Sequence, residues 1–201
     1  VFLSSGGFFG DIILKGLIDS PNFEVVGIVQ SRRVFKSDFG FLRGAWNFFY
    51  RCGPIYTVYI WSITTFAEWL GFVTGRGSIS ARARSCRLPF FRTRNINDSK
   101  GLEFVRNLHP HLLITAHFDQ KLFPPLCDGP EFAAVNLHPS FLPFYKGLEP
   151  VFRAWFDTDI PLGITLHRLS PEIDGGRILA IDSGENLFGQ SVFSRTCELM
   201  H

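Results

Sequence analysis

The first thirty residues contain a strand, a glycine-rich turn, a helix and a second strand in direct succession. Residues 1–5 predict a short apolar strand. The turn "GGFFG" then leads into "DIILKGLID", whose apolar residues recur at helical spacing until Pro21. Residues 23–29, "FEVVGIV", form the second β-rich run. Two neighbouring strands that are joined through a helix run parallel and cross over with a right hand. The opening therefore predicts a parallel sheet.

The same alternation returns after residue 87. "LPFFRT" predicts a strand, Asn97 or Asp98 can cap a helix that runs to about Leu108, and "HLLITAHF" (111–118) is typical of a strand buried on both faces. The strand "AAVNLH", the helix "EPVFRAWFDTD" and two antiparallel-looking strands, "LGITLHRL" and "RILAIDS", follow. These elements predict one α/β domain over residues 1–201, a Rossmann-like, doubly wound, mostly parallel sheet with a mixed edge.

Residues 34–83 do not follow this alternation. Within them, residues 55–73, "IYTVYIWSITTFAEWLGFV", predict a helix that is apolar and aromatic except for a stripe of Thr57, Thr64 and Glu68. We expect this helix to pack on the domain, with an in-plane membrane contact or a partner protein as the next interpretation. A membrane span is disfavoured because it would bury the carboxylate of Glu68 in lipid.

The charge of the chain is unevenly distributed. Residues 32–94 carry eleven Lys and Arg against two Asp and Glu, which gives 11 − 2 = +9, so the rest of the chain carries −7 of the total of +2. This basic segment could attract an anionic acceptor such as tRNA or a nucleotide sugar, or an acidic lipid surface, or it could be a solvated basic face.

The cysteines suggest where in the cell the protein works, and the chain ends suggest that the sequence is a fragment. The four cysteines (Cys52, Cys86, Cys127 and Cys197) show no C-x-x-C pair and no zinc-ligand spacing, and the first residues do not read as a signal peptide. We expect buried, reduced thiols in a cytoplasmic protein. Because the chain begins without Met and ends inside the helix-like "QSVFSRTCELMH", we expect a fragment that lacks a C-terminal part.

The stretch "AVNLHPSFLPFYKG" (134–147) concentrates polar residues at the end of a strand. Side chains alternate along a strand, so Asn136 and His138 point to one face, and Pro139 ends the ladder. Open α/β folds bind ligands at the carboxyl ends of their strands. The following loop contains two prolines and Gly147, and such a rigid loop can present backbone groups to a flat heterocycle. The alternative is that both side chains only satisfy loop backbone groups.

A carboxylate is available in the later turn "SPEIDGGRIL". Asp174 in this turn either bonds its own backbone or faces His138 across the same crevice, where it would fix the histidine tautomer. Asn136, His138 and Asp174 would then suit acyl transfer: an amide that donates to an oxyanion, a general acid/base, and a carboxylate that assists proton removal.

The two motifs together resemble the 10-formyltetrahydrofolate-dependent formyltransferases, the family of glycinamide ribonucleotide, methionyl-tRNA and sugar N-formyltransferases. "VNLHPSFLPFYKG" followed by "GITLHRLSPEIDGGRIL" is similar to that family's Asn-x-His-Pro-Ser pattern and its later Asp-x-Gly turn, and "HLLITAHFDQKLFPP" looks like its folate-lining strand. The resemblance implies 10-formyltetrahydrofolate as formyl donor, a primary amine as acceptor, no metal, and catalytic roles for Asn136, His138 and Asp174.

The resemblance also implies binding residues. The pterin of the folate would be contacted, largely through backbone groups, by Phe118, Gln120, Leu122, Ser140, Leu142, Leu169, Glu172 and Ile173. The loop "SSGGFFG", with Gly6, Gly7 and Phe8, lies where family members hold part of the acceptor, and it lacks the Gly-Ser-Asn pattern of the purine enzymes, so it looks closer to the tRNA and sugar branches. Segment 34–83 departs from the family pattern.

Other functions are compatible with such a fold. A nicotinamide-dependent oxidoreductase is disfavoured because G-x-G-x-x-G is not met and "VQSRR" offers no acidic residue for a ribose. A formyltetrahydrofolate hydrolase that uses water at the same three residues, and a binding protein without turnover, stay open. The identity of the acceptor amine also stays open.

Overall fold

A computed structural model of the chain describes residues 1–32, 40–127, 132–147, 150–155 and 163–183. In these residues seven strands form one sheet in the order β3-β2-β1-β4-β5-β6-β7. The strands are β1 (Phe2–Ser4), β2 (Ile28–Ser31), β3 (Phe90–Thr93), β4 (Leu112–Ala116), β5 (Ala133–His138), β6 (Gly163–Arg168) and β7 (Ile178–Ser183). The helix predicted at the end of the chain lies outside the described residues.

The sheet has the predicted mixed character. Neighbouring strands from β3 through β5 are parallel, and β6 pairs antiparallel with both β5 and β7. Strand order reverses direction at β1, where the chain returns to the other side of the sheet with β4. The prediction of a doubly wound, mostly parallel sheet with a mixed edge is confirmed. Such a reversal opens a crevice at the carboxyl ends of the strands.

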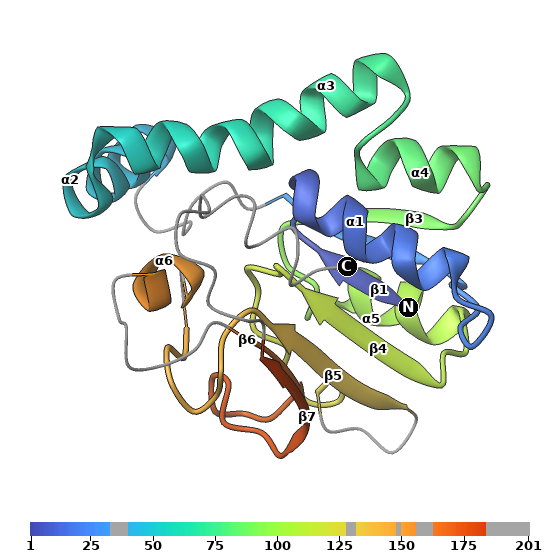
Figure 1. Ribbon diagram of the computed structural model, residues 1–201. Helices are drawn as coiled ribbons and strands as arrows, with labels where there is room; N and C mark the ends of the chain where they lie inside the picture. The colour runs from blue at the N-terminus through green and yellow to red at the C-terminus, as the bar shows by residue number, and fades with distance from the viewer. Residues whose placement is uncertain (33–39, 128–131, 148–149, 156–162, 184–201) are drawn as a thin grey trace.

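Helices cover both faces of the sheet (Figure 1). The helical elements are α1 (Gly7–Asp19), α2 (Gly40–Trp61), the π-helix η2 (Ser62–Phe66), α3 (Ala67–Thr74), α4 (Ile79–Ser85), α5 (Ser99–Asn107) and α6 (Pro150–Trp155). Alternate residues of β1 serve the two faces, since Phe2 packs in the core under α1 and α4 while Leu3 packs in the core under α5. Asp98, one of the two caps that the sequence allows, caps α5 by accepting a hydrogen bond from Gly101 N at 2.8 Å.

The second strand begins later than predicted. The sequence predicts a strand over residues 23–29, but β2 spans Ile28–Ser31. Its partner β1 has three residues, and their pairing starts with Phe2 opposite Ile28; just before it, the Gly27 carbonyl accepts from Phe2 N at 3.1 Å. The run "FEVV" lies before the paired residues, and pairing with β1 sets the residue at which β2 begins.

The crossover from β2 to β3 contains the atypical segment. Gly53, at φ 79° and ψ 165°, kinks α2, after which the helix continues through η2 into α3. The predicted helix over residues 55–73 is therefore present, but its predicted polar stripe is not on one face. Thr64 is exposed while Glu68 turns toward the protein, because the π-turn inserts a residue and rotates the helix beyond it. No helix in the described part of the chain is long and apolar enough to cross a membrane.

The end of this segment is part of the core. Ile79 and Ala83 of α4 are buried against α1, and Arg82 forms a two-point ion pair with the buried Asp11, with 2.7 Å for each N–O contact. Of the cysteines that the structure describes, Cys127 is buried as predicted, whereas Cys86 at the end of α4 is exposed. Neither of these two forms a disulfide bond.

Candidate active site

The pairing of β5 with β6 brings polar side chains together. Asn136 lies opposite His167, and His138 lies opposite Thr165, in an antiparallel register. Side chains of directly opposed residues lie on the same face of the sheet. Two residues of each strand therefore lie on one face of the sheet, near the carboxyl end of β5.

The amide of Asn136 has a fixed orientation. Its Oδ1 accepts a hydrogen bond from Thr115 Oγ1 of β4 at 2.8 Å. The other end, Nδ2, lies 3.1 Å from His167 Nε2 and 3.4 Å from Asp174 Oδ1. Because Thr115 occupies the carbonyl end, the NH2 group of Asn136 points toward the histidine and the carboxylate.

His167 completes the network, and the sequence pattern alone did not single it out. It is 1% exposed, and its Nδ1 lies 2.8 Å from the carbonyl oxygen of Arg168. A carbonyl only accepts, so Nδ1 donates to it, and Nε2 faces both Asn136 Nδ2 at 3.1 Å and Asp174 Oδ1 at 3.5 Å. The alternation in "GITLHRL" places Thr165 and His167 on one face, which is a usable signal, but only the register with β5 shows what they meet.

Asp174 reaches the same place from the turn between β6 and β7, which is one of the two arrangements that the sequence left open. Its backbone is left-handed, at φ 47°, and its Oδ2 accepts from Gly147 N at 2.8 Å and lies 3.6 Å from His138 Nδ1. Burial acts to raise the pKa of Asp174, but the imidazoles of His167 and His138 and the Gly147 N–H hold this pKa below its usual value. The group is therefore a carboxylate at neutral pH.

His138 is a buried imidazole whose two nitrogens face different oxygen atoms. Its Nε2 lies 3.2 Å from the carbonyl oxygen of Tyr145, so Nε2 carries the proton and the Nδ1 lone pair faces Asp174. Burial lowers the pKa of His138, and the Asp174 carboxylate and the Tyr145 carbonyl offset only part of that effect. The neutral ring is poised to take a proton at Nδ1, where Asp174 would stabilise the resulting imidazolium.

The loop 139–147 is held by hydrogen bonds to β6. Thr165 Oγ1 donates to the Ser140 carbonyl at 2.7 Å and accepts from Leu142 N at 3.1 Å. Ser140 Oγ in turn donates to the Phe144 carbonyl at 2.9 Å. The sequence predicts a rigid loop from its prolines, and in the structure a buried threonine is what anchors it.

The predicted folate-contact residues fall into different environments. Leu122, Ser140 and Leu142 are buried, Phe118 and Leu169 are half-buried, and Glu172 and Ile173 are exposed. The amide of Gln120 is fully engaged, since its Oε1 accepts from Ile96 N and its Nε2 donates to Ser31 Oγ and to the Thr93 carbonyl. The buried members can offer a ligand their backbone groups, and their role in binding stays a prediction.

The predicted acceptor loop meets an internal carboxylate. Glu68 of α3 accepts from Gly7 N at 3.2 Å through Oε2 and from Ser80 Oγ at 2.7 Å through Oε1. Within α1, Gly7–Asp19, no acidic residue lies in the first turn, and Gly6 at the N-cap has no side chain to cap the helix. Glu68 therefore supplies the negative partner that a helix N-terminus favours.

A further histidine follows β4. In the described part of the chain, Nε2 of His117 is buried without a hydrogen-bond partner, and the ring stacks on Phe9 with 5.5 Å between centroids. Burial lowers the pKa of His117 to about 4, helped by the positive charge that His138 can acquire. His117 is therefore neutral in the folded protein at physiological pH.

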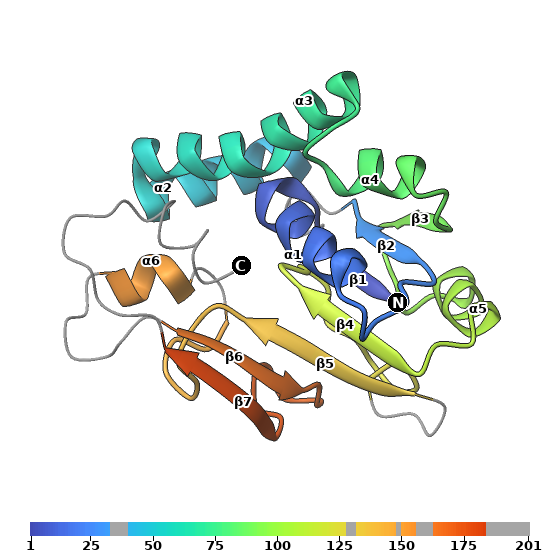
Figure 2. The same cartoon turned by 45° about the vertical axis from the view of Figure 1, so that its right-hand side comes forward.

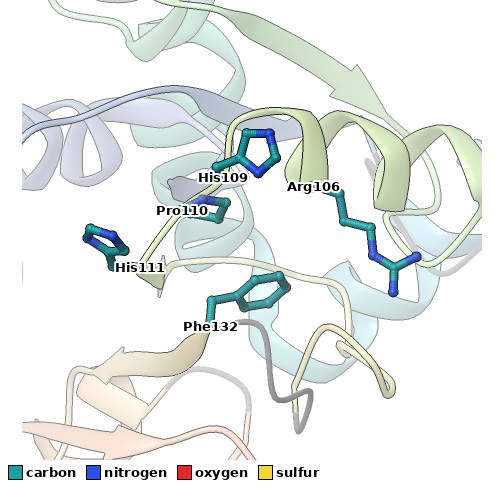
Figure 3. A pocket seen from close by; sticks show the side chains of 5 residues that line it. All are labelled: Arg106, His109, Pro110, His111 and Phe132. Atoms are coloured by element: carbon teal, nitrogen blue, oxygen red, sulfur yellow. The ribbon is translucent and has the colours of Figure 1, made fainter.

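A pocket lies near the amino ends of β4 and β5, and Figure 3 shows the side chains that line it. It has a volume of about 520 Å³, and Arg106, His109, Pro110, His111 and Phe132 line it. His111 and Phe132 flank the amino ends of β4 and β5, whereas Asn136 and His138 lie toward the carboxyl end of β5.

Among the described residues no group of three or more His, Cys, Asp or Glu could hold a metal ion. The side chains that converge at the end of β5 combine an amide donor, a base and a carboxylate, a set suited to acyl transfer.

Comparison with known proteins gives partial relatives in sequence. Methionyl-tRNA formyltransferase of Thermotoga maritima is 31% identical over 100 residues, which cover 50% of this chain and 32% of that protein. The bifunctional polymyxin resistance protein ArnA of Wigglesworthia glossinidia brevipalpis is 28% identical over 123 residues, which cover 60% of this chain and 19% of that protein. The chain thus spans about a third or less of the length of these curated relatives.

The fold and a family model complete the comparison. Phosphoribosylglycinamide formyltransferase from Campylobacter jejuni superposes with a TM-score of 0.62 at 22% identity, over 100% of this chain and 89% of that chain. At that identity the likeness shows the fold. The formyl transferase family model matches residues 74–189, more than half of the chain, and this range contains Asn136, His138 and Asp174. The chain therefore belongs to the formyl transferase family.

Proposed function

We propose that this chain transfers a formyl group from 10-formyltetrahydrofolate to a primary amine. The observation that carries the proposal is the convergence of Asn136, His138 and Asp174, with 3.4 Å from Asn136 Nδ2 to Asp174 Oδ1 and 3.6 Å from His138 Nδ1 to Asp174 Oδ2. Family membership supports the same chemistry. Formyl transfer needs a donor for the developing oxyanion and a base for the attacking amine, and this site supplies both.

Asn136 would stabilise the tetrahedral oxyanion. One of its N–H groups bonds His167 at 3.1 Å, while the contact to Asp174 at 3.4 Å is near the long limit of a hydrogen bond. The second N–H is therefore the one that a developing oxyanion can take from Asp174. Thr115 and His167 act as positioning residues, because they hold the two ends of the amide.

His138 would act as the base, with Asp174 as its partner. The lowered pKa of His138 leaves it neutral at neutral pH, so it can accept the proton that the amine loses on attacking the formyl carbon. The carboxylate of Asp174 then faces an imidazolium and stabilises it. Breaking the bond between the formyl carbon and the folate nitrogen returns a proton to that nitrogen, and His138 is suited to supply it.

The relatives and the charge of the chain support a proposal for the acceptor class. The sequence relatives are named as a methionyl-tRNA formyltransferase and as ArnA, and residues 32–94 of this chain carry a net charge of +9. We therefore propose an anionic acceptor, of the methionyl-tRNA or amino-sugar-nucleotide type, as the first to be screened. Residues Gly6, Gly7 and Phe8 stay our proposed contact for it, beside the carboxylate of Glu68.

The test is a tetrahydrofolate-release assay with purified protein. 10-Formyltetrahydrofolate is supplied with methionyl-tRNA or with amino-sugar nucleotides, and the formylated amine is identified by mass spectrometry. His138→Ala should lower the rate by about 10²–10⁴-fold, the contribution of a positioned acid/base group. Asp174→Asn keeps the size of the side chain but removes the charge, so it should lower the rate and move the pH profile.

His111→Ala is the matched control, because it makes the same substitution at an exposed histidine before β4. It should keep the wild-type rate. Equal losses in His111→Ala and His138→Ala would contradict the proposed site. Release of tetrahydrofolate without any acceptor would instead assign a formyltetrahydrofolate hydrolase, and binding without release would assign a binding protein.

A further inference from the structure

The long helix between β2 and β3 exposes large apolar side chains to solvent. In Figures 1 and 2, α2 and α3 form an arm above α1, at the edge of the molecule. The apolar residues exposed on the second half of the arm are Ile55, Val58, Trp61, Phe66, Trp69, Leu70, Phe72 and Val73, which we call the outer face. Ile55 is 86% exposed and Trp69 is 58% exposed, values that are unusual for residues of their kind.

The arm differs from an ordinary surface helix, because apolar residues lie on its exposed side as well as on the side where Ile63 packs against the core. A surface helix turns its apolar stripe to the core and its charges to water. Here the sole carboxylate of the arm's second half, Glu68, turns inward to Gly7 N and Ser80 Oγ, while the tryptophans point out.

Close backbone contacts fix this orientation. A Cβ on Gly7 would lie 2.7 Å from the carbonyl oxygen of Ile63, and a Cβ on Gly71 would lie 2.5 Å from the Cβ of Ser78. The arm therefore touches the domain at glycines on both sides of the contact. Rotation that would bury the outer face against the domain would break these contacts and the Glu68 hydrogen bonds.

The charge around the outer face has one sign. Of the eight arginines in residues 40–94, Arg82 is paired with Asp11, and Arg92 lies 3.9 Å from the inward-facing Glu68, so carboxylates offset these two. Arg76 after α3 is exposed, and the exposed Arg84 lies with its guanidinium 5.0 Å from the centroid of the Phe72 ring. Basic side chains thus border the apolar residues.

We propose that the outer face binds in the plane of an anionic lipid membrane. Aromatic and aliphatic side chains enter the boundary between headgroups and acyl chains, while bordering arginines contact the acidic headgroups. The aliphatic members Ile55, Val58 and Val73 favour lipid over a nucleic acid, because they offer neither a stacking surface nor a hydrogen bond. The exposed Arg76 and Arg84 favour an acidic lipid over a second copy of this chain, since two faces bordered by these cations would repel.

The proposal is independent of the catalytic assignment. Membrane attachment involves the outer face and its arginines, none of which belongs to the Asn136–His138–Asp174 site. A protein that binds vesicles without formyl transfer, or the reverse, would separate the two proposals.

The test is flotation of the purified protein with phosphatidylcholine vesicles, with and without phosphatidylglycerol. Binding should require the anionic lipid and fall as NaCl is raised. Because Trp46, Trp61 and Trp69 are all exposed on the arm, tryptophan emission should shift to the blue on binding and be quenched by brominated acyl chains. Trp61→Ser and Trp69→Ser should each weaken binding about tenfold, the value of removing one large apolar side chain. Arg76→Gln should weaken it about fivefold, the contribution of one arginine near an anionic surface.

Phe23→Ser is the matched control, because it removes an aromatic side chain that is 47% exposed but lies beyond the end of α1. This variant should bind vesicles like the wild type. Circular dichroism would establish that each variant keeps its fold. The proposal is overturned by equal binding to neutral vesicles, by undiminished binding of the Trp61→Ser/Trp69→Ser variant, or by no emission shift with anionic vesicles. Self-association or RNA binding without vesicle binding would also overturn it, in favour of those partners.

Discussion

His117 should make the stability of this protein fall on acidification. Its Nε2 is buried without a hydrogen-bond partner in the described residues, and its pKa is lowered to about 4 from 6.5. Between these two values the unfolded chain binds a proton at His117 that the folded chain does not. Stability therefore rises with pH in this window and is lost as the pH falls through it.

The size of the effect follows from the two pKa values. One pKa unit corresponds to about 1.4 kcal/mol, so the full window of 6.5 to about 4 corresponds to about 3 kcal/mol. Between about pH 7.5 and about pH 5 the share of His117 is about 2 kcal/mol. His138, whose pKa is also lowered, adds to the same slope.

The substitution that isolates this term is His117→Phe. A phenyl ring keeps the stacking on Phe9 but cannot be protonated. Urea unfolding of both proteins at the two pH values, followed by circular dichroism, gives the free energies. The wild type should lose about 2 kcal/mol more than the variant on acidification. If the two proteins lose the same stability within about 0.5 kcal/mol, burial of a neutral His117 is refuted.

Three substitutions test the contacts that hold the site and the arm. Thr165→Val should lower the free energy of unfolding by about 1–3 kcal/mol, because it leaves two backbone groups of the loop 139–147 without their buried hydroxyl partner. Urea unfolding measures this loss. A loss near zero would contradict the anchoring role of Thr165. Asp11→Asn should lower the free energy of unfolding by about 2 kcal/mol in the same assay, since it removes the charge from the two-point contact with Arg82. A change below about 0.5 kcal/mol would show that the ion pair is solvated. Gly7→Ala should lower the free energy of unfolding by about 1–2 kcal/mol, because φ is +80° at this residue and the new Cβ would meet the backbone of η2. Limited proteolysis should then cut the arm faster. Unchanged cleavage would argue against docking of the arm at Gly7.

The doubly wound, mostly parallel character of the sheet was predictable from the sequence, and so were the limits of β5, whereas the limits of β2 were not. The alternation of apolar runs with helical segments reports what each segment does by itself. The limits of β2 depend on its partner, since the ladder starts where Phe2 meets Ile28. The same holds for the arm: its helical character is local, but the inward turn of Glu68 depends on a π-turn and on the backbone of Gly7, 61 positions away.

The candidate site was predictable as far as strand alternation reaches. Asn136 and His138 share a face because they are two apart on β5. Asp174 could be named but not placed, because its approach depends on a left-handed turn and on the Gly147 N–H. His167 was missed because its partner is set by the β5–β6 register, which depends on a long connection that no local pattern constrains.

Glu68 links the arm to the proposed acceptor loop, and this decides how the arm can be tested. The N-terminus of α1 has Gly6 as its cap and receives its negative partner from Glu68. Deleting residues 36–80 would remove that carboxylate together with Ile79, which is fully buried beside α1. The deletion would therefore expose the amides of α1 as an anion site and open the core at once, so weaker or stronger acceptor binding could not be attributed to the arm's basic charge. Glu68→Gln keeps the arm, the core and a hydrogen-bond acceptor for Gly7 N while it removes the charge. Comparing this variant with Arg76→Gln separates an effect at the acceptor loop from an effect of the basic surface.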